Sequence, residues 1–486
     1  MQIILRGTAA GYEAEHTARI FFPGAEKAPQ VPAAGDFVLA VSHAQTDFVL
    51  LRRGGSLRWR SALRAPGADA EYALCSLLYS LLKEQTGQQP PWGMMTGVRP
   101  VRIIHDLRAM GATEQQVEDR FLRHFACSPQ KFALAREIAD RQRPLLDAAD
   151  PMDCSVYAGI PFCPTRCSYC SFVSRTVGDK ATQALVQPYV DALCRELTEI
   201  RALADRCGLR IRTFYIGGGT PTSLSAAQLE QLMAHIAATF DLGSLAEYTV
   251  EAGRPDCTDA EKLRILKQYG ATRISINPQT FSDQVLRNIG RRHTAQDIID
   301  CFAAARAAGH DNINMDLIAG LPGDTVEGFA GSLEQAVALD PENITVHTLT
   351  LKRASNLVVE HRAADYDDVA AMLERCALLQ RAGYAPYYLY RQKGTLQNLE
   401  NTGWSKPGRE CLYNIYIMEE VHTILSAGAG GSTKLVIPGK RHGKIERIFN
   451  FKYPTEYIDR FAEILDRKRR VEDFYEHYAA QKAGQP

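Results

Sequence analysis

The sequence lacks three features that would assign it at once to a simple class of protein. No apolar run approaches the roughly 18 residues that span a bilayer, and neither charge is in excess, since 56 Lys and Arg balance 56 Asp and Glu. Arg6 directly follows a very short apolar start, which is not the pattern of a secretory signal. Binders of nucleic acid and of membrane surfaces use a basic excess. We therefore expect a cytoplasmic protein with no membrane span and no nucleic-acid partner.

Disorder is also excluded by the composition. The chain has 486 residues, of which 45% are hydrophobic and 23% charged, whereas disordered chains are poor in apolar residues. At roughly 100–200 residues per domain, this length predicts two to four domains, each able to bury a core.

The cysteines carry more information than the charge. There are 12 of them, and without a secretion signal we do not expect a disulfide framework. Three, Cys163, Cys167 and Cys170, form the pattern C-x3-C-x2-C. Closely spaced thiolates in a reducing compartment indicate a metal or redox role. The other nine are expected to be packing residues, because a free cysteine behaves as a small buried hydrophobe.

Three kinds of site compete for this motif. A structural zinc site needs four ligands, but no histidine is near, and Cys154 is separated from the motif by an expected strand. A thioredoxin-like site uses Cys167 and Cys170 and leaves Cys163 unexplained. A [4Fe–4S] cluster held by three thiolates leaves one iron open for a small-molecule ligand. We favour the cluster, with zinc as the main alternative.

The central part of the chain alternates between two kinds of segment. Apolar runs suited to buried strands occupy 156–160, 213–216, 247–251, 272–276, 313–318 and 344–349. Amphipathic stretches suited to crossover helices occupy 187–206, 225–239, 258–269, 295–308 and 325–339. This alternation predicts an α/β fold with a parallel sheet, curled into an open (β/α)6 partial barrel.

The flanking regions have a different pattern. Short expected strands, at 37–41 and 48–51, precede helical periodicity at 71–85 and 112–147. We expect three parts: an N-terminal α+β domain of unknown role, the barrel, and a C-terminal mixed α/β domain that covers the substrate. Their bounds are 1–150, 151–352 and 353–486.

Polar or glycine-rich sequence follows almost every expected strand of the barrel, where barrel enzymes place their chemistry. The cysteine loop follows the first strand, and Gly217-Gly218-Gly219-Thr220 follows the second. Glu251 ends the third strand, Gln279 follows the fourth, and Asp316 lies in the fifth. This agreement in position predicts one active site at the carboxyl ends of the strands.

These motifs resemble a known family. The run from Tyr157 through Cys170, the Gly217–Thr222 segment, Gln279, Arg291 and Asp316–Pro322 are similar in order and spacing to the radical S-adenosylmethionine (SAM) enzymes. Within them the chain resembles the oxygen-independent coproporphyrinogen III oxidase-like branch. Outer segments look like the HemZ-type coproporphyrinogen dehydrogenases; these are 96–100, 388–393 and 398–401.

The resemblance implies a role for each matching residue. Cys163, Cys167 and Cys170 would hold a [4Fe–4S] cluster, whose open iron would bind SAM. Tyr157 and Glu251 would be the catalytic residues beside the cluster and SAM. The remaining SAM contacts would run from the methionine end to the ribose and adenine: Gly218, Gly219, Thr220, Arg291, Gln279, Asp316 and Tyr169.

The activity implied is the oxidative decarboxylation of coproporphyrinogen III propionates to vinyl groups, giving protoporphyrinogen IX in haem biosynthesis. It requires a one-electron reductant of the flavodoxin or ferredoxin type. Two differences from the family pattern argue against assigning this activity to the chain. Gly159 replaces a family histidine, and Ser171 replaces an additional cysteine. The alternatives are a haem chaperone of the same branch, a radical SAM enzyme acting on another tetrapyrrole, and a binding protein with a structural cluster.

A tetracarboxylic substrate needs several cationic partners. Four cations lie in or after the last expected strand of the barrel: Arg353, Arg391, Lys393 and Arg409. We expect them near the barrel mouth.

Overall fold

The computed structural model describes residues 1–7, 11–97, 99–352, 355–359, 366–438 and 445–483. The chain forms two compact units, one of residues 1–137 and 391–400, the other of residues 138–390 and 401–486. The three-part division expected from the sequence stays a prediction. Within the described ranges, no helix combines the length and apolarity needed to cross a membrane.

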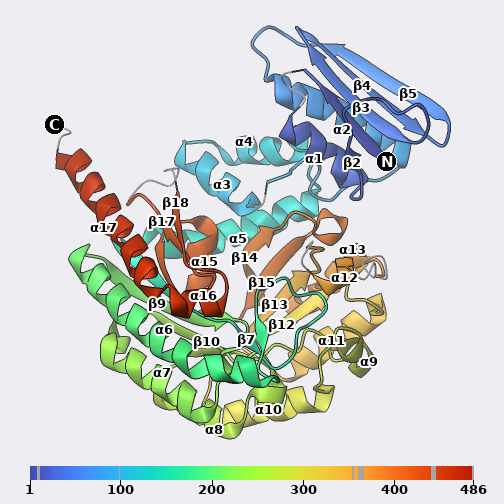
Figure 1. Ribbon diagram of the computed structural model, residues 1–486. Helices are drawn as coiled ribbons and strands as arrows, with labels where there is room; N and C mark the ends of the chain where they lie inside the picture. Colours follow the sequence, from blue (N-terminus) through green and yellow to red (C-terminus); the bar gives the residue numbers. More distant parts are fainter. Residues whose placement is uncertain (8–10, 98, 353–354, 360–365, 439–444, 484–486) are drawn as a thin grey trace. The chain divides into compact units, whose positions relative to one another are not determined.

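The first unit contains a five-stranded sheet in the order β2-β1-β3-β4-β5 (Figure 1). β1 and β3 are parallel, whereas β3, β4 and β5 form an antiparallel meander. Alternating apolar residues of β3 and β4 face helices α1 and α2, and this contact forms the core. The elements are β1 (Gln2–Arg6), α1 (Tyr12–Phe21), β2 (Glu26–Lys27), β3 (Phe37–His43), β4 (Thr46–Arg53), β5 (Ser56–Leu63), α2 (Ala70–Thr86), α3 (Pro100–Ala109) and α4 (Glu114–Asp119).

A short return of the chain completes the first unit. Residues 391–400 come back to it from the second unit, and their side chains are bonded to residues far away in sequence. Trp92 is fully buried, and its Nε1 donates to Glu400 Oε2 at 2.7 Å. Lys131 forms an ion pair with the same carboxylate. The first unit therefore depends on ten residues synthesised long after the rest of it.

The second unit is built on the expected barrel. Six strands, β6, β9, β10, β11, β12 and β13, lie side by side in chain order and are parallel. Their bounds confirm the expected α/β alternation: β6 (Asp153–Ile160), β9 (Arg210–Gly218), β10 (Glu247–Glu251), β11 (Arg273–Ser275), β12 (Ile313–Ala319) and β13 (Asn343–Thr348).

Crossover helices cover the outer face of this sheet (Figure 1). Each begins with a polar N-cap side chain, such as Ser225 and Thr294, which accept from backbone N–H groups in capping boxes. The helices are α6 (Lys180–Arg206), α7 (Ala226–Thr239), α8 (Ala260–Gln268), α9 (Asp283–Asn288), α10 (Ala295–Ala307) and α11 (Val326–Ala338); α5 (Pro129–Asp147) precedes the barrel.

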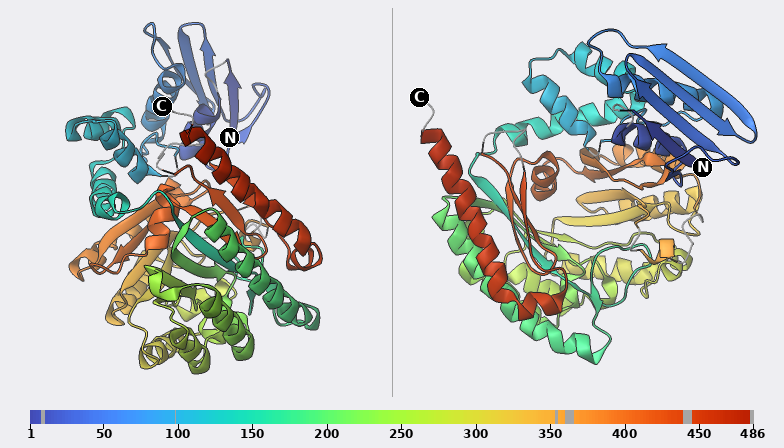
Figure 2. Two further views of the ribbon diagram at one scale, coloured as in Figure 1. Left: turned by 90° about the vertical axis from the view of Figure 1, so that its left-hand side faces the viewer. Right: turned by 45° about the horizontal axis from the view of Figure 1, so that its top comes forward.

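The C-terminal part extends the barrel sheet at both edges to 11 strands. β15 pairs antiparallel with β13 and β14 lies beyond it, while β16 pairs parallel with β6 on the other edge. Helix α17 lies along α6 (Figure 2). The bounds are α12 (Asn356–Val359), α13 (Val369–Glu374), α14 (Ala377–Arg381), β14 (Ala385–Arg391), β15 (Glu400–Ser405), α15 (Leu412–Glu419), β16 (Thr423–Ala427), β17 (Ser432–Leu435), β18 (Glu446–Phe449), α16 (Pro454–Asp459) and α17 (Phe461–Ala483).

Candidate functional site

A cavity of about 140 Å³ opens at the carboxyl ends of β6, β9, β10 and β11. Parallel strands deliver their ends to one edge of the sheet, so loops distant in sequence meet there. The cavity is lined by most of the residues expected from the sequence: Cys163, Cys167, Cys170, Tyr169, Gly218, Gly219, Thr220, Glu251, Gln279 and Arg291.

Each of the three cysteine sulfurs receives a hydrogen bond. Cys163 lies on the short strand β7 (Phe162–Cys163), and its Sγ accepts from Thr220 Oγ1 at 3.6 Å. Cys167 Sγ accepts from Arg254 Nη1 at 3.4 Å. Cys170 Sγ accepts from the Phe172 N–H at 3.4 Å. Donors aimed at sulfur stabilise a thiolate, so the three residues fit the ligand set of an iron–sulfur cluster.

Burial has the opposite effect while the thiols are free. It raises the pKa of Cys163 and of Cys170 above the ordinary value of 9.0. These thiols are therefore protonated at neutral pH, and iron binding must displace their protons. Cys154 is the residue that a zinc site would need as its fourth ligand. It is fully buried within β6 and does not line the cavity.

The glycine loop after β9 packs directly against the cysteine loop. Gly218 has φ of 109°, a conformation that side-chain-bearing residues rarely adopt. A Cβ on Gly219 would lie 2.5 Å from the Phe162 carbonyl oxygen and 2.9 Å from Cys163 Sγ. Glycine is thus required at position 219 by the close approach of the two loops.

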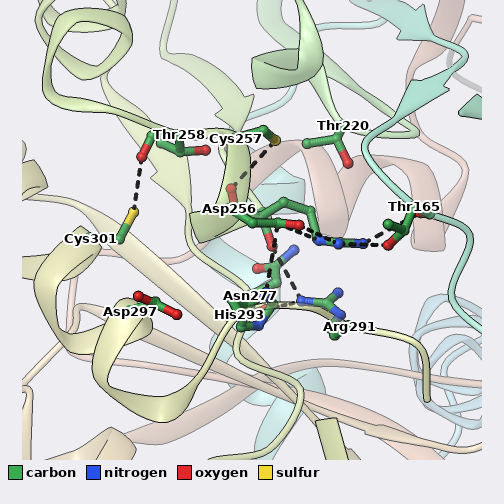
Figure 3. Close-up of polar contacts among 12 residues, drawn as sticks. Thr165, Thr220, Asp256, Cys257, Thr258, Asn277, Arg291, His293, Asp297 and Cys301 are labelled. Atoms are coloured by element: carbon green, nitrogen blue, oxygen red, sulfur yellow. Dashed lines mark hydrogen bonds and ion pairs between the residues drawn. The ribbon is translucent and has the colours of Figure 1, made fainter. Parts of the chain in front are cut away.

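Arg291 lines the cavity and is bonded on one side. Its Nη1 donates to the Asn277 carbonyl oxygen at 2.6 Å (Figure 3), and its Nη2 to Tyr169 Oη at 3.2 Å. Its buried Nε has no partner among the described residues. One donor of a buried guanidinium is therefore left for a ligand, which fits the carboxylate expected from the resemblance.

Glu251 lies at the end of β10 and accepts a hydrogen bond of 2.6 Å from Tyr215 Oη. Burial raises its pKa to about 7, and the nearby Asp316 carboxylate adds to the shift. Tyr215 in turn stacks on Tyr413 at 4.6 Å between ring centroids, with Tyr157 6.1 Å away. Tyr157 thus belongs to an aromatic cluster behind Glu251 and does not line the cavity.

This raised pKa predicts a pH-dependent stability. Between its ordinary pKa of 4.5 and about 7, the folded protein holds a proton on Glu251 that the unfolded chain releases, so the free energy of unfolding falls as the pH rises through this window. The total loss is on the order of 3 kcal/mol. Glu251→Gln keeps the acceptor for Tyr215 and removes the titration. In thermal unfolding without SAM, we expect the stability of the variant relative to the wild type to increase from pH 5 to pH 8. A difference in stability that does not change with pH contradicts the prediction.

Gln279 and Asp316 are joined through their backbones. The Gln279 N–H donates to the Asp316 carbonyl oxygen at 2.8 Å, and Gln279 has φ of 68°. A residue other than glycine in the left-handed region costs free energy, and such residues are typical of functional sites. Burial opposes ionisation of Asp316, but His347 and Asn314 hold its pKa below the ordinary value. Asp316 is not among the residues that line the cavity, and its contact with SAM stays a prediction.

Sequence reasoning missed Arg254, which is 4% exposed and holds the cysteine loop. Besides Cys167, its guanidinium bonds Thr165 Oγ1 at 2.9 Å and forms a two-point pair with Asp256. The buried His293 lies 3.7 Å from the same carboxylate (Figure 3). Arg254 lies three residues after the end of β10. This position at the carboxyl end of a strand could have identified it from the sequence.

Replacing Arg254 tests this role. Arg254→Gln removes the N–H donor to Cys167 and one partner of Asp256, so we expect a more negative cluster potential and a faster loss of iron to a chelator. Outer-shell partners of metal ligands are typically worth about 10–100-fold in affinity. Potentiometric titration followed by electron paramagnetic resonance measures the first effect. Arg287→Gln, on the exposed side of α9, is the control; equal behaviour of both variants contradicts the assignment.

Comparison with known proteins agrees with this geometry. A model of the radical SAM superfamily matches residues 157–336. The oxygen-independent coproporphyrinogen-III oxidase-like protein HemZ of Bacillus subtilis is 36% identical over 95% of this chain and 95% of its own length. The chain belongs to the radical SAM superfamily. Within it, the chain belongs with the HemZ-like proteins, as the sequence motifs predicted.

Other relatives cover less of the chain. The heme chaperone HemW of Bacillus subtilis is 41% identical over 41% of this chain and 51% of its own. HemW of Escherichia coli is 29% identical over 65% and 78%. The solved structure of coproporphyrinogen III oxidase HemN from Escherichia coli superposes with a TM-score of 0.52 at 24% identity, covering 66% of this chain and 72% of that one. This superposition supports the radical SAM fold.

Radical SAM proteins use a [4Fe–4S] cluster and SAM, and these are the cofactors of this chain. The three sulfurs with their donors, the glycine loop without room for a Cβ and the unpaired Nε of Arg291 fit both groups.

The cations expected near the barrel mouth belong to different parts of the chain, and their place at the barrel mouth stays a prediction. Arg391 and Lys393 belong to the first unit, whereas Arg409 belongs to the second and pairs with Asp311 at 3.8 Å. Arg353 lies outside the described residues.

Proposed function

We propose that this protein is a radical SAM oxidoreductase that converts propionate side chains of coproporphyrinogen III to vinyl groups, giving protoporphyrinogen IX. The observation that carries the proposal is the single cavity shared by three cysteines, the glycine loop, Glu251, Gln279 and Arg291. The HemZ relative, similar over nearly the whole chain, supports the choice of a tetrapyrrole substrate. A cluster with a purely structural role has no use for the polar groups that surround this one.

Different residues of the cavity are proposed to bind the cluster and SAM. Cys163, Cys167 and Cys170 would hold the cluster, which would leave one iron for SAM. When bound, the two cofactors supply a one-electron reduction that yields an organic radical able to remove a hydrogen atom from the substrate. A flavodoxin- or ferredoxin-like protein is the proposed reductant.

The remaining side chains orient SAM. The backbone at Gly218, Gly219 and Thr220 receives the methionine end, where side chains would obstruct it. Arg291 offers its free Nε to the carboxylate, and the ionised form of Glu251 attracts the cationic end of SAM. A bound cation lowers the pKa of Glu251, so SAM binding releases a proton near neutral pH.

Gln279 and Tyr169, which both line the cavity, would hold the nucleoside. Gln279 would bond the ribose hydroxyls, and its backbone N–H is held by the Asp316 carbonyl oxygen. Tyr169 packs by the adenine and is kept in place by its bond from Arg291. Tyr157 and its aromatic neighbours exclude water from the region behind Glu251, which protects a reactive species.

The haem chaperone alternative meets an obstacle in α15. The chaperones carry a haem motif His-Asn-x-x-Tyr-Trp, and its nearest counterpart here is the run from Tyr413 to Ile417, which lacks the His and the Trp. Tyr413 and Tyr416 are both buried, and Tyr416 stacks on His422 at 3.9 Å. His422 Nδ1 lies 3.0 Å from Ser155 Oγ, and burial lowers the pKa of its ring to about 4. These side chains are occupied in packing.

One anaerobic experiment tests the proposal. The protein is reconstituted with iron and sulfide, reduced, and given SAM with coproporphyrinogen III. Vinyl product together with 5′-deoxyadenosine is the expected result. 5′-Deoxyadenosine without vinyl product overturns the substrate and leaves another tetrapyrrole. Haem retained through gel filtration, with little SAM cleavage, overturns the enzyme in favour of the chaperone. Intact SAM under all conditions leaves only a structural cluster.

A further inference from the structure

A second cavity, of about 170 Å³, lies wholly within the first unit. It is bounded by α1, by the segment after Trp92 and by the 391–400 return. The residues that matter here are His16, Arg19, Thr96, Arg391, Lys393 and Asn398. Arginine, lysine, histidine and amide side chains make this lining rich in hydrogen-bond donors.

Arg391 is the centre of this arrangement. It is 3% exposed, and its guanidinium lies over the Trp92 ring, 5.6 Å from the centroid. Its Nη1 donates to the carbonyl oxygens of Met95 and Gly97, at 2.6 and 3.2 Å, and its Nη2 to that of Asn398 at 3.2 Å. Its Nε is buried without a partner among the described residues.

The charge of Arg391 is not balanced by a neighbouring carboxylate. Among the described residues none lies within 4.0 Å of its guanidinium, and Glu400 acts on it only at longer range. Burial accordingly lowers its pKa to about 10. A buried cation without a counter-ion is costly, and an anion in the cavity would remove that cost.

Two other residues that line the cavity also carry unused donors. Asn398 Nδ2 and Arg19 Nε are both buried and have no partner among the described residues. The carboxylates near this cavity are already paired, since Glu15 bonds Arg19 Nη2 at 2.9 Å and Glu13 accepts from Thr96. Three residues that line this cavity therefore each carry an N–H group without an acceptor, and a ligand with several acceptor oxygens suits them.

The loop and its surroundings hold these donors in place. Gln397 and Asn398 both have left-handed backbones, with φ of 50° and 56°, a strained pair of the kind found at ligand sites. Lys393 Nζ lies 4.1 Å from the Tyr12 ring centroid, and Tyr12 stacks on His16 at 3.8 Å. The ammonium is thereby fixed at the rim of the cavity.

We propose that this cavity binds an oxyanion, a carboxylate or a phosphate group, through Arg391 Nε, Asn398 Nδ2, Arg19 Nε and the Lys393 ammonium. Guanidinium and amide N–H groups suit the oxygens of either anion. Such a group has two sources: a propionate of the tetrapyrrole, or free or nucleotide phosphate. The inference does not require that coproporphyrinogen III be turned over, because it concerns binding alone.

Two variants test the site in the full-length protein. Asn398→Asp keeps the shape and the tolerance for a left-handed backbone but replaces a donor with a negative charge. Lys393→Gln removes an exposed cation whose loss does not threaten folding. The matched controls are Gln45→Glu and Arg58→Gln, which make the same charge changes at exposed positions of β3–β5 in the same unit. Circular dichroism verifies that each variant is folded.

Isothermal titration calorimetry with inorganic phosphate and with coproporphyrin III is the measurement. We expect each of the two cavity variants to weaken binding of at least one anion about ten-fold, with the controls unchanged. Loss with both anions identifies a general oxyanion site; loss with coproporphyrin III alone identifies a propionate, and loss with phosphate alone a phosphate group. The proposal is overturned if neither anion binds, or if the controls weaken binding as much as Asn398→Asp and Lys393→Gln. Failure of vinyl formation, with anion binding intact, counts only against the proposed function.

Discussion

Replacing Cys167 by serine is expected to leave the protein without its cluster. Cys167 is 8% exposed, and its loop is tied down where the Ser168 N–H donates to the Ile289 carbonyl oxygen at 3.0 Å. A serine oxygen at this place would be a poor ligand for iron, because thiolates are the ligands that iron–sulfur clusters require. We expect iron and sulfide per chain to fall by about ten-fold or more, and the brown absorption of the reconstituted protein to disappear.

Cys376→Ser is the matched control for this variant. Cys376 is also buried, at 6% exposure, but it lies between α13 and α14 and does not line the cluster cavity. It should reconstitute as the wild type does, with a modest loss of stability. Equal loss of iron from both variants would refute the ligand assignment.

Gly219→Ala is expected to have the second largest effect. The added methyl group would lie within 3 Å of the Phe162 carbonyl oxygen and of Cys163 Sγ, closer than atoms can approach without movement. The backbone of either loop must shift, which costs about 1–3 kcal/mol and moves one cluster ligand. We expect a lower unfolding midpoint for the protein without its cofactors, and weak SAM binding by equilibrium dialysis after reconstitution.

The control for this change is Gly331→Ala in α11. A Cβ at Gly331 meets nothing within 4 Å, so alanine should stabilise the helix by about 0.5–1 kcal/mol. SAM binding should be unaffected. If Gly219→Ala is as harmless as Gly331→Ala, then the close packing of the two loops does not shape the site.

The barrel and most of its site could be predicted from the sequence because both depend on local patterns. Apolar runs separated by amphipathic stretches predicted the six parallel strands. Once the strands are parallel, their ends share an edge, so the cysteine loop, Gly219, Glu251 and Gln279 had to lie near one another. No distances were needed for this conclusion.

Other site residues could not be predicted because tertiary contacts decide where their side chains point. Arg254 is one of 56 Lys and Arg, and only the structure turns it toward Cys167. The contact of Asp316 with SAM stays a prediction, and the sequence does not indicate that its backbone carbonyl oxygen accepts from the Gln279 N–H. The place of Tyr157 beside the cofactors stays a prediction, and the sequence does not indicate that its ring packs with Tyr215 and Tyr413.

The strand pairings at the edges of the sheet also could not be predicted from the sequence. β16 pairs with β6 although Thr423 and Cys154, which lie opposite each other, are far apart in sequence. The run 423–427 is short, and no periodicity indicates its partner strand. Pairings of this kind are settled by the packing of the whole unit, as is the place of β15 beside β13.

The return of residues 391–400 to the first unit has a consequence for the order of events on the ribosome. Residues 1–137 emerge first, but the partners of Trp92 and Lys131 follow only after about 250 further residues. At about 5–20 residues per second, this delay is roughly 13–50 seconds. During that time Trp92 has no acceptor from Glu400, and Lys131 lacks its ion-pair partner. The first unit is therefore completed long after residues 1–137 have been made, and a nascent chain arrested before residue 391 would expose it to chaperones and proteases.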